Sequence, residues 1–343
     1  MINIRWISMS ALFVILTVIF SACTLSSEEP TVVIYTSVDQ VYAEPILQQF
    51  EEQTGIRVLA VYDVEATKTT GLVNRLIAEQ DRPQADVFWS GEFIQTLLLK
   101  DEGLLAPYNS PNNADLPAYF IDTDYYWTAF GGRARVILVN TDRVPLTEAP
   151  DGLADLLDLR WEPDRIGIAN PLFGTTYTHA AAIYAAEGTN TAHQYFADLA
   201  ERHVRVLDGN SVVRDLVAAG ELDLGLTDTD DACGALANGA NVAIIYPDQG
   251  EGEAGTLVIP NTVALIAGGP NPEEGQILID YLLSIEVEST LVASGWFQIP
   301  SRNSGARPAC PESLPHRVIE LPLEDIYHAL EQTKTDLTDL FMR

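Results

Sequence analysis

The sequence predicts an α/β fold of two lobes that are joined by two extended crossing strands. Strand and helix patterns alternate along residues 31–108 and again along residues 165–228, as in sheets covered by helices on both faces. Two long apolar runs, residues 125–140 and 256–269, are too hydrophobic for surface linkers. A mature chain of about 320 residues also exceeds one hydrophobic core of ordinary size.

The first lobe is expected to begin with three strands, each followed by a helix. The strand segments are short and rich in β-branched residues, whereas the helix segments place apolar residues on one face. Gly55 marks the end of the first helix. The expected strands are residues 31–38, 56–64 and 85–90, and the expected helices are residues 42–55, 69–80 and 92–103.

The second lobe repeats this alternation between the two crossing runs, and the chain then returns to the first lobe. We expect strands at residues 165–170, 204–208 and 222–228, helices at residues 178–188, 191–203 and 211–220, further helices within residues 271–295, and a terminal helix at residues 323–341. The first lobe is therefore assigned residues 31–130 and 256–305, and the second lobe residues 131–255 and 306–343. Ligands of such sheets lie beyond the carboxyl ends of the strands, and two lobes with a hinge can close around them.

Residues 1–22 have the features of a secretory signal peptide. The basic start MINIR precedes the apolar run WISMSALFVILTVIF, which is short for a membrane-spanning helix. The run ends in FSAC, which resembles the lipobox of bacterial lipoproteins, with Phe20 where Leu is usual and Cys23 as the lipidated residue. Residues 23–30 would then be a tether, and the lipid the only membrane anchor. The alternative is an ordinary signal peptide that is cleaved nearby, and both place the protein outside the cytoplasm.

The mature chain is strongly acidic. Cleavage after residue 22 removes Arg5 and no acidic residue, so the net charge changes from −30 to about −31. This charge argues against binding to nucleic acid, whose phosphates proteins neutralise with Lys and Arg, and against electrostatic binding to anionic lipid. It is compatible with the attraction of cations and with solubility alone.

The cysteine and histidine patterns indicate neither a zinc site nor an enzyme. Outside the cytoplasm Cys233 and Cys310 are able to form a disulfide, although the sequence does not show that they meet. The histidines are scattered, and each of them, His179 included, is expected at a surface or capping position. No G-x-S-x-G, H-E-x-x-H or Cys/His pair occurs. We therefore expect no catalytic residues, and the remote alternative is a secreted hydrolase that uses paired carboxylates.

An acidic cluster follows the last strand predicted in the second lobe. The segment GLTDTDDACGA, residues 225–235, places Asp228, Asp230 and Asp231 within four positions. One of them is expected to cap the helix that follows, but close solvated carboxylates repel one another by about 1 kcal/mol per pair. The surplus of charge predicts a bound cation. Arg133 and Arg135 alternate along the crossing run, so at least one is expected to point inward and pair with carboxylates.

Six segments carry a resemblance to a known family: VVIYTSVDQVYAEPILQQFEEQTGIRV, PQADVFWSGEF, GLLAPY, GRARVILVNTDRVP, IGIANPLFGTTYTHAAAIYA and GGPNPEEGQILIDYLLS. In this order, from about residue 31 to residue 305, they resemble the extracellular solute-binding proteins of ferric-iron-type ABC importers. The resemblance implies the type II periplasmic-binding-protein fold, also called the Venus flytrap. It also implies a monomeric receptor that delivers a small solute to an ABC permease and its ATPase subunit; the chain has no GxxxxGK[ST] motif of its own.

Carried over position by position, the resemblance implies a site of hard oxygen donors. Ferric binders place a histidine after the first strand, where this chain has Asp39, and a glutamate after the third strand, which corresponds to Glu92. Their two adjacent tyrosines in the second lobe correspond to Asp230 and Asp231. Carboxylates suit Fe³⁺ or another hard cation, so these four residues are the expected metal ligands. The expected ligand-binding residues of this group are Ser37, Asp39, Glu92, Asp228, Asp230 and Asp231.

The resemblance also implies an oxyanion site. Gly174, Thr175 and Thr176 precede an apolar helix, so backbone amides and hydroxyls there can hold an anion. In the family this loop, with an asparagine that corresponds to Asn210, holds an oxyanion that completes the coordination of iron. Ordinary helix capping by Thr176 or Thr178 is the alternative.

The leading expectation for the transported ligand is ferric iron with a synergistic anion, and no prosthetic group is expected. The alternative ligand is an organic solute. It would be either an amine held by the acidic residues or a phosphonate-like anion held at Gly174–Thr176.

Overall fold

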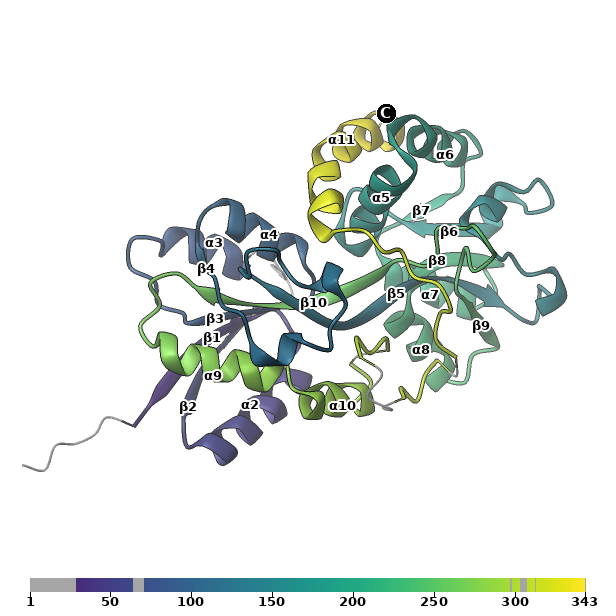
Figure 1. The fold of residues 1–343 in the computed structure, drawn as a ribbon. Helices are drawn as coiled ribbons and strands as arrows, with labels where there is room; N and C mark the ends of the chain where they lie inside the picture. The colour runs from purple at the N-terminus through teal and green to yellow at the C-terminus, as the bar shows by residue number, and fades with distance from the viewer. Residues whose placement is uncertain (1–28, 64–70, 297, 303–306, 312, 343) are drawn as a thin grey trace, which may run out of the picture. The chain divides into compact units, whose positions relative to one another are not determined.

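Ten strands of the described residues join in one mixed sheet, which is drawn in Figure 1. The strands are β1 (Thr31–Thr36), β2 (Arg57–Tyr62), β3 (Val87–Ser90), β4 (Leu105–Ala106), β5 (Thr128–Asn140), β6 (Ile166–Ala169), β7 (Arg205–Leu207), β8 (Leu224–Asp228), β9 (Val242–Ile245) and β10 (Val258–Ile266). Their order is β2-β1-β3-β10-β5-β8-β6-β7, with β4 beside β10 and β9 beside β5. The β1, β2 and β3 strands are parallel, as are β6, β7 and β8, whereas β5 and β10 are antiparallel to their neighbours.

This computed structural model describes residues 29–63, 71–296, 298–302, 307–311 and 313–342. The predicted signal peptide, the lipidation residue Cys23 and most of the predicted tether lie outside them. Residues Thr31–Arg343 form one compact unit, and the proposed lobe boundaries within it stay a prediction. None of the helices in these described ranges has the length and apolar character needed to cross a membrane.

Strand β5 is the element that links the two groups of parallel strands. Its first half, residues 128–134, pairs with β10, and its second half, residues 135–140, pairs with β8 and β9. The first crossing strand predicted from the sequence is therefore confirmed. The chain returns toward the first group through residues 246–257 and β10, and the carbonyl of Leu257 accepts a hydrogen bond of 2.9 Å from the backbone N–H of Arg135.

The helices match the periodic segments of the sequence closely, and the largest difference is at one helix start. Helix α5 begins at Gly174 rather than at residue 178, so Thr175 and Thr176 lie in its first turn and not before it. The helices are α2 (Gln40–Thr54), α3 (Gly71–Ala78), α4 (Ile94–Asp101), α5 (Gly174–Glu187), α6 (Thr189–Glu201), α7 (Asn210–Ala218), α8 (Thr229–Ala237), α9 (Pro272–Leu282), α10 (Ile285–Ala293) and α11 (Leu323–Phe341), besides short 3₁₀ turns.

Helices cover both faces of the first parallel group because successive strand side chains point to opposite faces. Phe88 packs into the apolar cluster that contains residues of α3 and α4, whereas its neighbour Trp89 packs into the cluster with α2, α9 and α10. Figure 1 shows these two sets of helices on either side of the strands. The second group is covered in the same way, by α5, α6 and α11 on one face and by α7 and α8 on the other.

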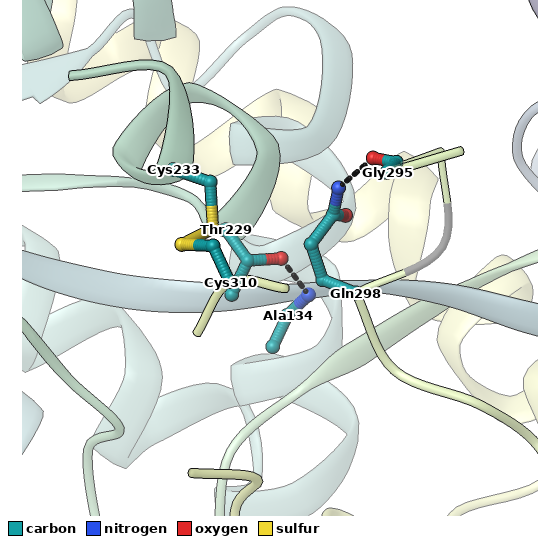
Figure 2. The surroundings of a disulfide bond; sticks show 6 residues. All are labelled: Ala134, Thr229, Cys233, Gly295, Gln298 and Cys310. Atoms are coloured by element: carbon teal, nitrogen blue, oxygen red, sulfur yellow. Dashed lines mark hydrogen bonds between the residues drawn. A yellow bond between two sulfur atoms is a disulfide. The ribbon is translucent and has the colours of Figure 1, made fainter. Parts of the chain in front are cut away.

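A disulfide between Cys233 and Cys310 fixes helix α8 to the segment before α11, as Figure 2 shows. The two cysteines lie 77 positions apart in the sequence. Helix α8 is also held to strand β5, because the Oγ1 atom of Thr229 accepts a hydrogen bond of 3.0 Å from the N–H of Ala134. The start of α8, where the acidic cluster lies, is thus anchored to the strand that links the two groups.

Reduction of this disulfide is expected to destabilise the protein. A bridge that closes a loop of 77 residues restricts the unfolded chain, which corresponds to about 4.5 kcal/mol of unfolding free energy. Denaturant unfolding with and without reductant measures the difference. The double variant Cys233→Ser/Cys310→Ser is the control and should be insensitive to reductant; an equal loss in wild type and variant would contradict this account.

Candidate functional site

The acidic cluster lies where β8 ends and α8 begins. Asp228 is the last residue of β8, and Asp230 and Asp231 are in the first turn of α8. Among the described residues these three carboxylates form a group whose ligand atoms all lie within 4.8 Å of one another. Negative charge at the start of a helix is favoured by the helix dipole, but three acidic groups exceed what this requires.

Asp228 is buried and hydrogen-bonded through both carboxylate oxygens. Its Oδ1 accepts from Nη1 of Arg135 at 2.7 Å, and its Oδ2 accepts from Oγ1 of Thr175 at 2.6 Å and from Nδ2 of Asn210 at 2.9 Å. The carboxylate makes no capping hydrogen bond to α8. The expectation that one aspartate caps this helix therefore does not hold for Asp228.

Arg135 is the centre of this network. Its side chain is fully buried, and besides Asp228 it donates to Oγ1 of Thr176 at 3.3 Å and to Nδ1 of His179 at 3.4 Å. Burial of a guanidinium is tolerated because it is paired and hydrogen-bonded. The predicted inward pairing of an arginine with a carboxylate is confirmed.

His179 was expected at the surface or at a cap, and this expectation is wrong. The side chain is 2 % exposed. Burial, and then the charge of Arg135, lower its pKa well below the usual value, so the imidazole is neutral and accepts the arginine's hydrogen bond. The sequence around His179 does not indicate this burial, because the contact with Arg135 joins residues 44 positions apart and forms only in the folded chain.

Arg133 lies next to the same carboxylates but is less completely satisfied. Its Nε atom is 3.8 Å from Oδ2 of Asp228 and, although enclosed, has no hydrogen-bond partner among the residues that the structure describes. The Oδ1 atom of Asp230 is enclosed in the same way and also lacks a partner. Burial alone would lower the Arg133 pKa, but the surrounding carboxylates, Asp230 first, raise it overall. These two enclosed atoms are therefore the polar atoms of Arg133 and Asp230 whose hydrogen bonding is incomplete among the described residues.

The two carboxylates in the first turn of α8 are held in an environment that disfavours their charge. Burial, followed by the charges of Asp230 and Asp228, raises the pKa of Asp231 to about 7, although Arg214 donates to it at 3.1 Å. Burial also raises the pKa of Asp230, against the opposing charge of Arg133. A nearby cation would relieve both shifts.

The residues predicted from the first lobe are not part of the acidic group. The carboxylate of Glu92 accepts hydrogen bonds from the N–H groups of Ile94, at 2.9 Å, and Gln95, at 3.2 Å, so it caps the start of α4. Burial raises its pKa, and its negative charge also acts on Arg133. Ser37 accepts a hydrogen bond of 3.0 Å from the N–H of Gly91.

Asp39 stands immediately before helix α2 and makes no capping hydrogen bond there. Neither Asp39 nor Glu92 has an oxygen among the described carboxylates that gather within 4.8 Å. Their role as metal ligands therefore stays a prediction.

The residues predicted to hold an oxyanion do come together. Asn210 donates to Oγ1 of Thr175 at 2.8 Å, and Thr176 donates to Oδ1 of Asn210 at 3.3 Å. Gly174 starts the helix with φ of 55°, a conformation that favours glycine. The alternative of ordinary capping finds no support, since Thr176 contacts Arg135 and Thr178 donates back to the carbonyl of Gly174. Sequence reasoning identified these residues but missed that Asp228 is their shared partner.

A family model for the bacterial extracellular solute-binding protein matches residues 82–320, well over half of the chain. The chain belongs to the bacterial extracellular solute-binding proteins. This membership places it outside the cytoplasm, as the sequence predicted. The family is one of solute receptors in transport.

Relatives of this solute-binding protein differ in the ligand that their names state. It is 26 % identical over 274 residues to iron uptake protein A1 of Synechocystis, which covers 76 % of this chain and 72 % of that protein. It is equally 26 % identical over 228 residues to a putative 2-aminoethylphosphonate-binding periplasmic protein of Salmonella typhimurium. That match covers 66 % of this chain and 65 % of the relative, slightly less than two thirds of its length.

Solved structures confirm the predicted fold class, the type II periplasmic-binding-protein fold. The ferric binding protein of Campylobacter jejuni superposes with a TM-score of 0.78 at 22 % identity, over 90 % of this chain and 99 % of that chain. The Trichodesmium FutA protein, solved with iron and citrate ligands, gives a TM-score of 0.80 at 21 % identity, over 91 % and 100 %. At these identities the similarity shows the fold alone.

The raised pKa of Asp231 predicts a loss of stability as the pH rises. The carboxyl of Asp231 has a pKa of about 7 in the folded state and about 3.9 in the unfolded state. Between these two pH values the folded state therefore binds more protons than the unfolded state, and the stability gained from the raised pKa is largest at low pH. Unfolding free energy should therefore fall between about pH 4 and pH 7. Denaturant unfolding across this range measures it, and Asp231→Asn should flatten the decline; an unchanged slope would contradict the assignment.

Proposed function

We propose that this solute-binding protein captures ferric iron with the carboxylates at the start of α8 and delivers it to an ABC permease and its ATPase subunit. The observation that carries the proposal is the placement of Asp230 and Asp231 beside Asp228, in a group whose ligand atoms lie within 4.8 Å of one another. Ionised carboxylates are hard oxygen donors of the kind that Fe³⁺ prefers. The names of relatives that bind or take up iron support the same choice.

The charges around the cluster support a cationic ligand. Each of two carboxylates already has a basic partner, since Asp228 pairs with Arg135 and Asp231 with Arg214. Arg133 lies 3.8 Å from Asp228 and also interacts electrostatically with Asp230, and the pKa values of Asp230 and Asp231 are nevertheless raised. Burial and mutual repulsion of this kind are what a bound cation would offset. Of the three acidic residues, Asp230 has an enclosed oxygen for which the described part of the chain offers no hydrogen-bond partner, so it is the first ligand to test.

Capture would involve both lobes. We assign residues 31–130 and 256–305 to one lobe and residues 131–255 and 306–343 to the other, with strand β5 passing between them. Its pairing first with β10 and then with β8 and β9 supports this division. Closure would bring Asp39 and Glu92 toward the second-lobe carboxylates, with rotation about the linking strands.

The protein would act as a monomeric receptor without catalytic residues, attached to the membrane only by lipid on Cys23. The extracytoplasmic location of the family and the cysteine at the end of the apolar leader support this attachment. Iron would be its cargo rather than a prosthetic group.

An organic ligand is the second candidate because some relatives are named for 2-aminoethylphosphonate. The amine of such a solute would pair with Asp230 and Asp231, and its anionic group would need donors near Thr175. Calorimetric titration with ferric citrate, spermidine and 2-aminoethylphosphonate separates the candidates. Saturable heat of binding with ferric citrate supports the leading proposal. Saturable heat with spermidine or 2-aminoethylphosphonate, but none with ferric citrate, overturns it.

Loss of the two first-turn carboxylates should abolish iron binding. The variant Asp230→Asn/Asp231→Asn keeps the shape of both side chains but removes the charges that attract Fe³⁺, so affinity should fall by at least about 100-fold. Iron content after dialysis and calorimetry measure it. The exposed Asp115, changed to Asn, is the matched control; wild-type affinity in the double variant would refute the proposed ligands.

Iron bound by carboxylates should be nearly colourless in the visible range. Phenolate ligands give Fe³⁺ an intense visible charge-transfer band, whereas carboxylates do not, and the tyrosine positions of the resembling family are Asp230 and Asp231 here. Absorption spectra during titration with ferric citrate test this prediction. An intense band that grows in proportion to bound iron would show that tyrosine ligates the metal instead.

A further inference from the structure

We infer that Asp228 is a built-in anion: its carboxylate fills the oxyanion site at the start of α5 and so restricts the receptor to ligands that bring no oxyanion there. Sequence reasoning assigned this site to a synergistic anion or to the anionic group of a phosphonate. If Asp228 occupies the site, the transported ligand is one that brings no oxyanion. This depends on the proposed function only for the assumption that the transported ligand binds beside this network.

The network has the composition of an anion-binding site. A guanidinium from Arg135, a hydroxyl from Thr175 and an amide from Asn210 all donate to one carboxylate, at 2.7, 2.6 and 2.9 Å. These donors come from three separate elements, β5, α5 and α7, and α5 and α7 present their first turns to it. Such a convergence of charged and neutral donors at helix starts is the usual environment of a bound anion.

The carboxylate is buried and already occupies the donors that a second anion would need. Asp228 is 3 % exposed and Arg135 is fully buried. Two of these donors make further bonds within the network, since Asn210 also donates to Thr175, and Arg135 also donates to Thr176 and His179. Beside them, the enclosed Nε of Arg133 lies 3.8 Å from Oδ2 of Asp228 and has no hydrogen-bond partner among the described residues. A free oxyanion would therefore have to displace a carboxylate that is covalently attached at the site and has a high effective concentration there.

The position of Asp228 explains why it differs in role from the other acidic residues of the cluster. Both of its oxygens are committed to donors, whereas Asp230 has an enclosed oxygen without a partner. Asp228 is therefore a positioning residue that neutralises Arg135, and Asp230 and Asp231 face the ligand. A cation bound there needs no oxyanion from solution, and the anionic group of a phosphonate finds the donors Arg135, Thr175 and Asn210 occupied by Asp228.

Removal of the carboxylate should create a binding site for acetate. The substitution Asp228→Gly deletes a CH₂–COO⁻ side chain, which has nearly the size, shape and charge of an acetate ion. In this variant acetate should bind at least about tenfold more tightly than in the wild type, and should raise the thermal midpoint in proportion to its occupancy. Asp231→Gly is the matched control: it removes a carboxylate three positions away, but that residue accepts from Arg214 near the surface, so no acetate site should appear. Asp228→Asn keeps the site filled and should not gain acetate binding either.

A folded Asp228→Gly variant that does not gain acetate binding would overturn the inference, and so would an equal gain in Asp231→Gly. The wild type provides a readout that does not depend on the folding of any variant, since it should give no saturable heat with phosphate or methylphosphonate. Saturable binding of either anion by the wild type would also overturn the inference. None of these titrations contains iron, so failure of the iron proposal and failure of this inference are separate results.

Discussion

The buried ion pair between Arg135 and Asp228 is the interaction on which the rest of the site depends. Arg135 lies on the strand that links both groups of parallel strands, and Asp228 ends the strand beside it. A guanidinium without this partner would be an uncompensated buried charge, which proteins tolerate poorly. The pair fixes the start of α8 and the first turns of α5 and α7 around one carboxylate, and the carboxylates of Asp230 and Asp231 are placed by the same arrangement.

Much of the fold could be predicted because local patterns carry it. The terminal helix was expected at residues 323–341 and is found at Leu323–Phe341, since one amphipathic period runs through it without interruption. The linking strand was recognisable because it is apolar over a length that no surface linker would have. The start of α5 was misplaced because Thr175 and Thr176 are residues that commonly precede helices, and only their contacts with Arg135 and Asn210 show that they belong to the first turn.

The sequence predicted several residues of the site but not the hydrogen bonds that join them. Sequence reasoning selected Thr175, Asn210 and Asp228 for different reasons, but they come from separate elements, and no local pattern states that they share a hydrogen-bond network. The same limit applies to the disulfide, whose cysteines are 77 positions apart. Glu92 had the residue type of a ligand, yet both of its oxygens cap α4, a role that depends on where that helix begins.

The central claim is that a cation binds to Asp230 and Asp231 while the Arg135–Asp228 pair stays intact. A crystal structure of the iron-loaded protein, with anomalous diffraction recorded at the iron absorption edge, tests it most directly. The account predicts an iron peak bonded to carboxylate oxygens of Asp230 and Asp231, with Asp228 still held by Arg135. Iron bonded to tyrosine oxygens, or an oxyanion that has displaced Asp228 from its donors, would contradict it.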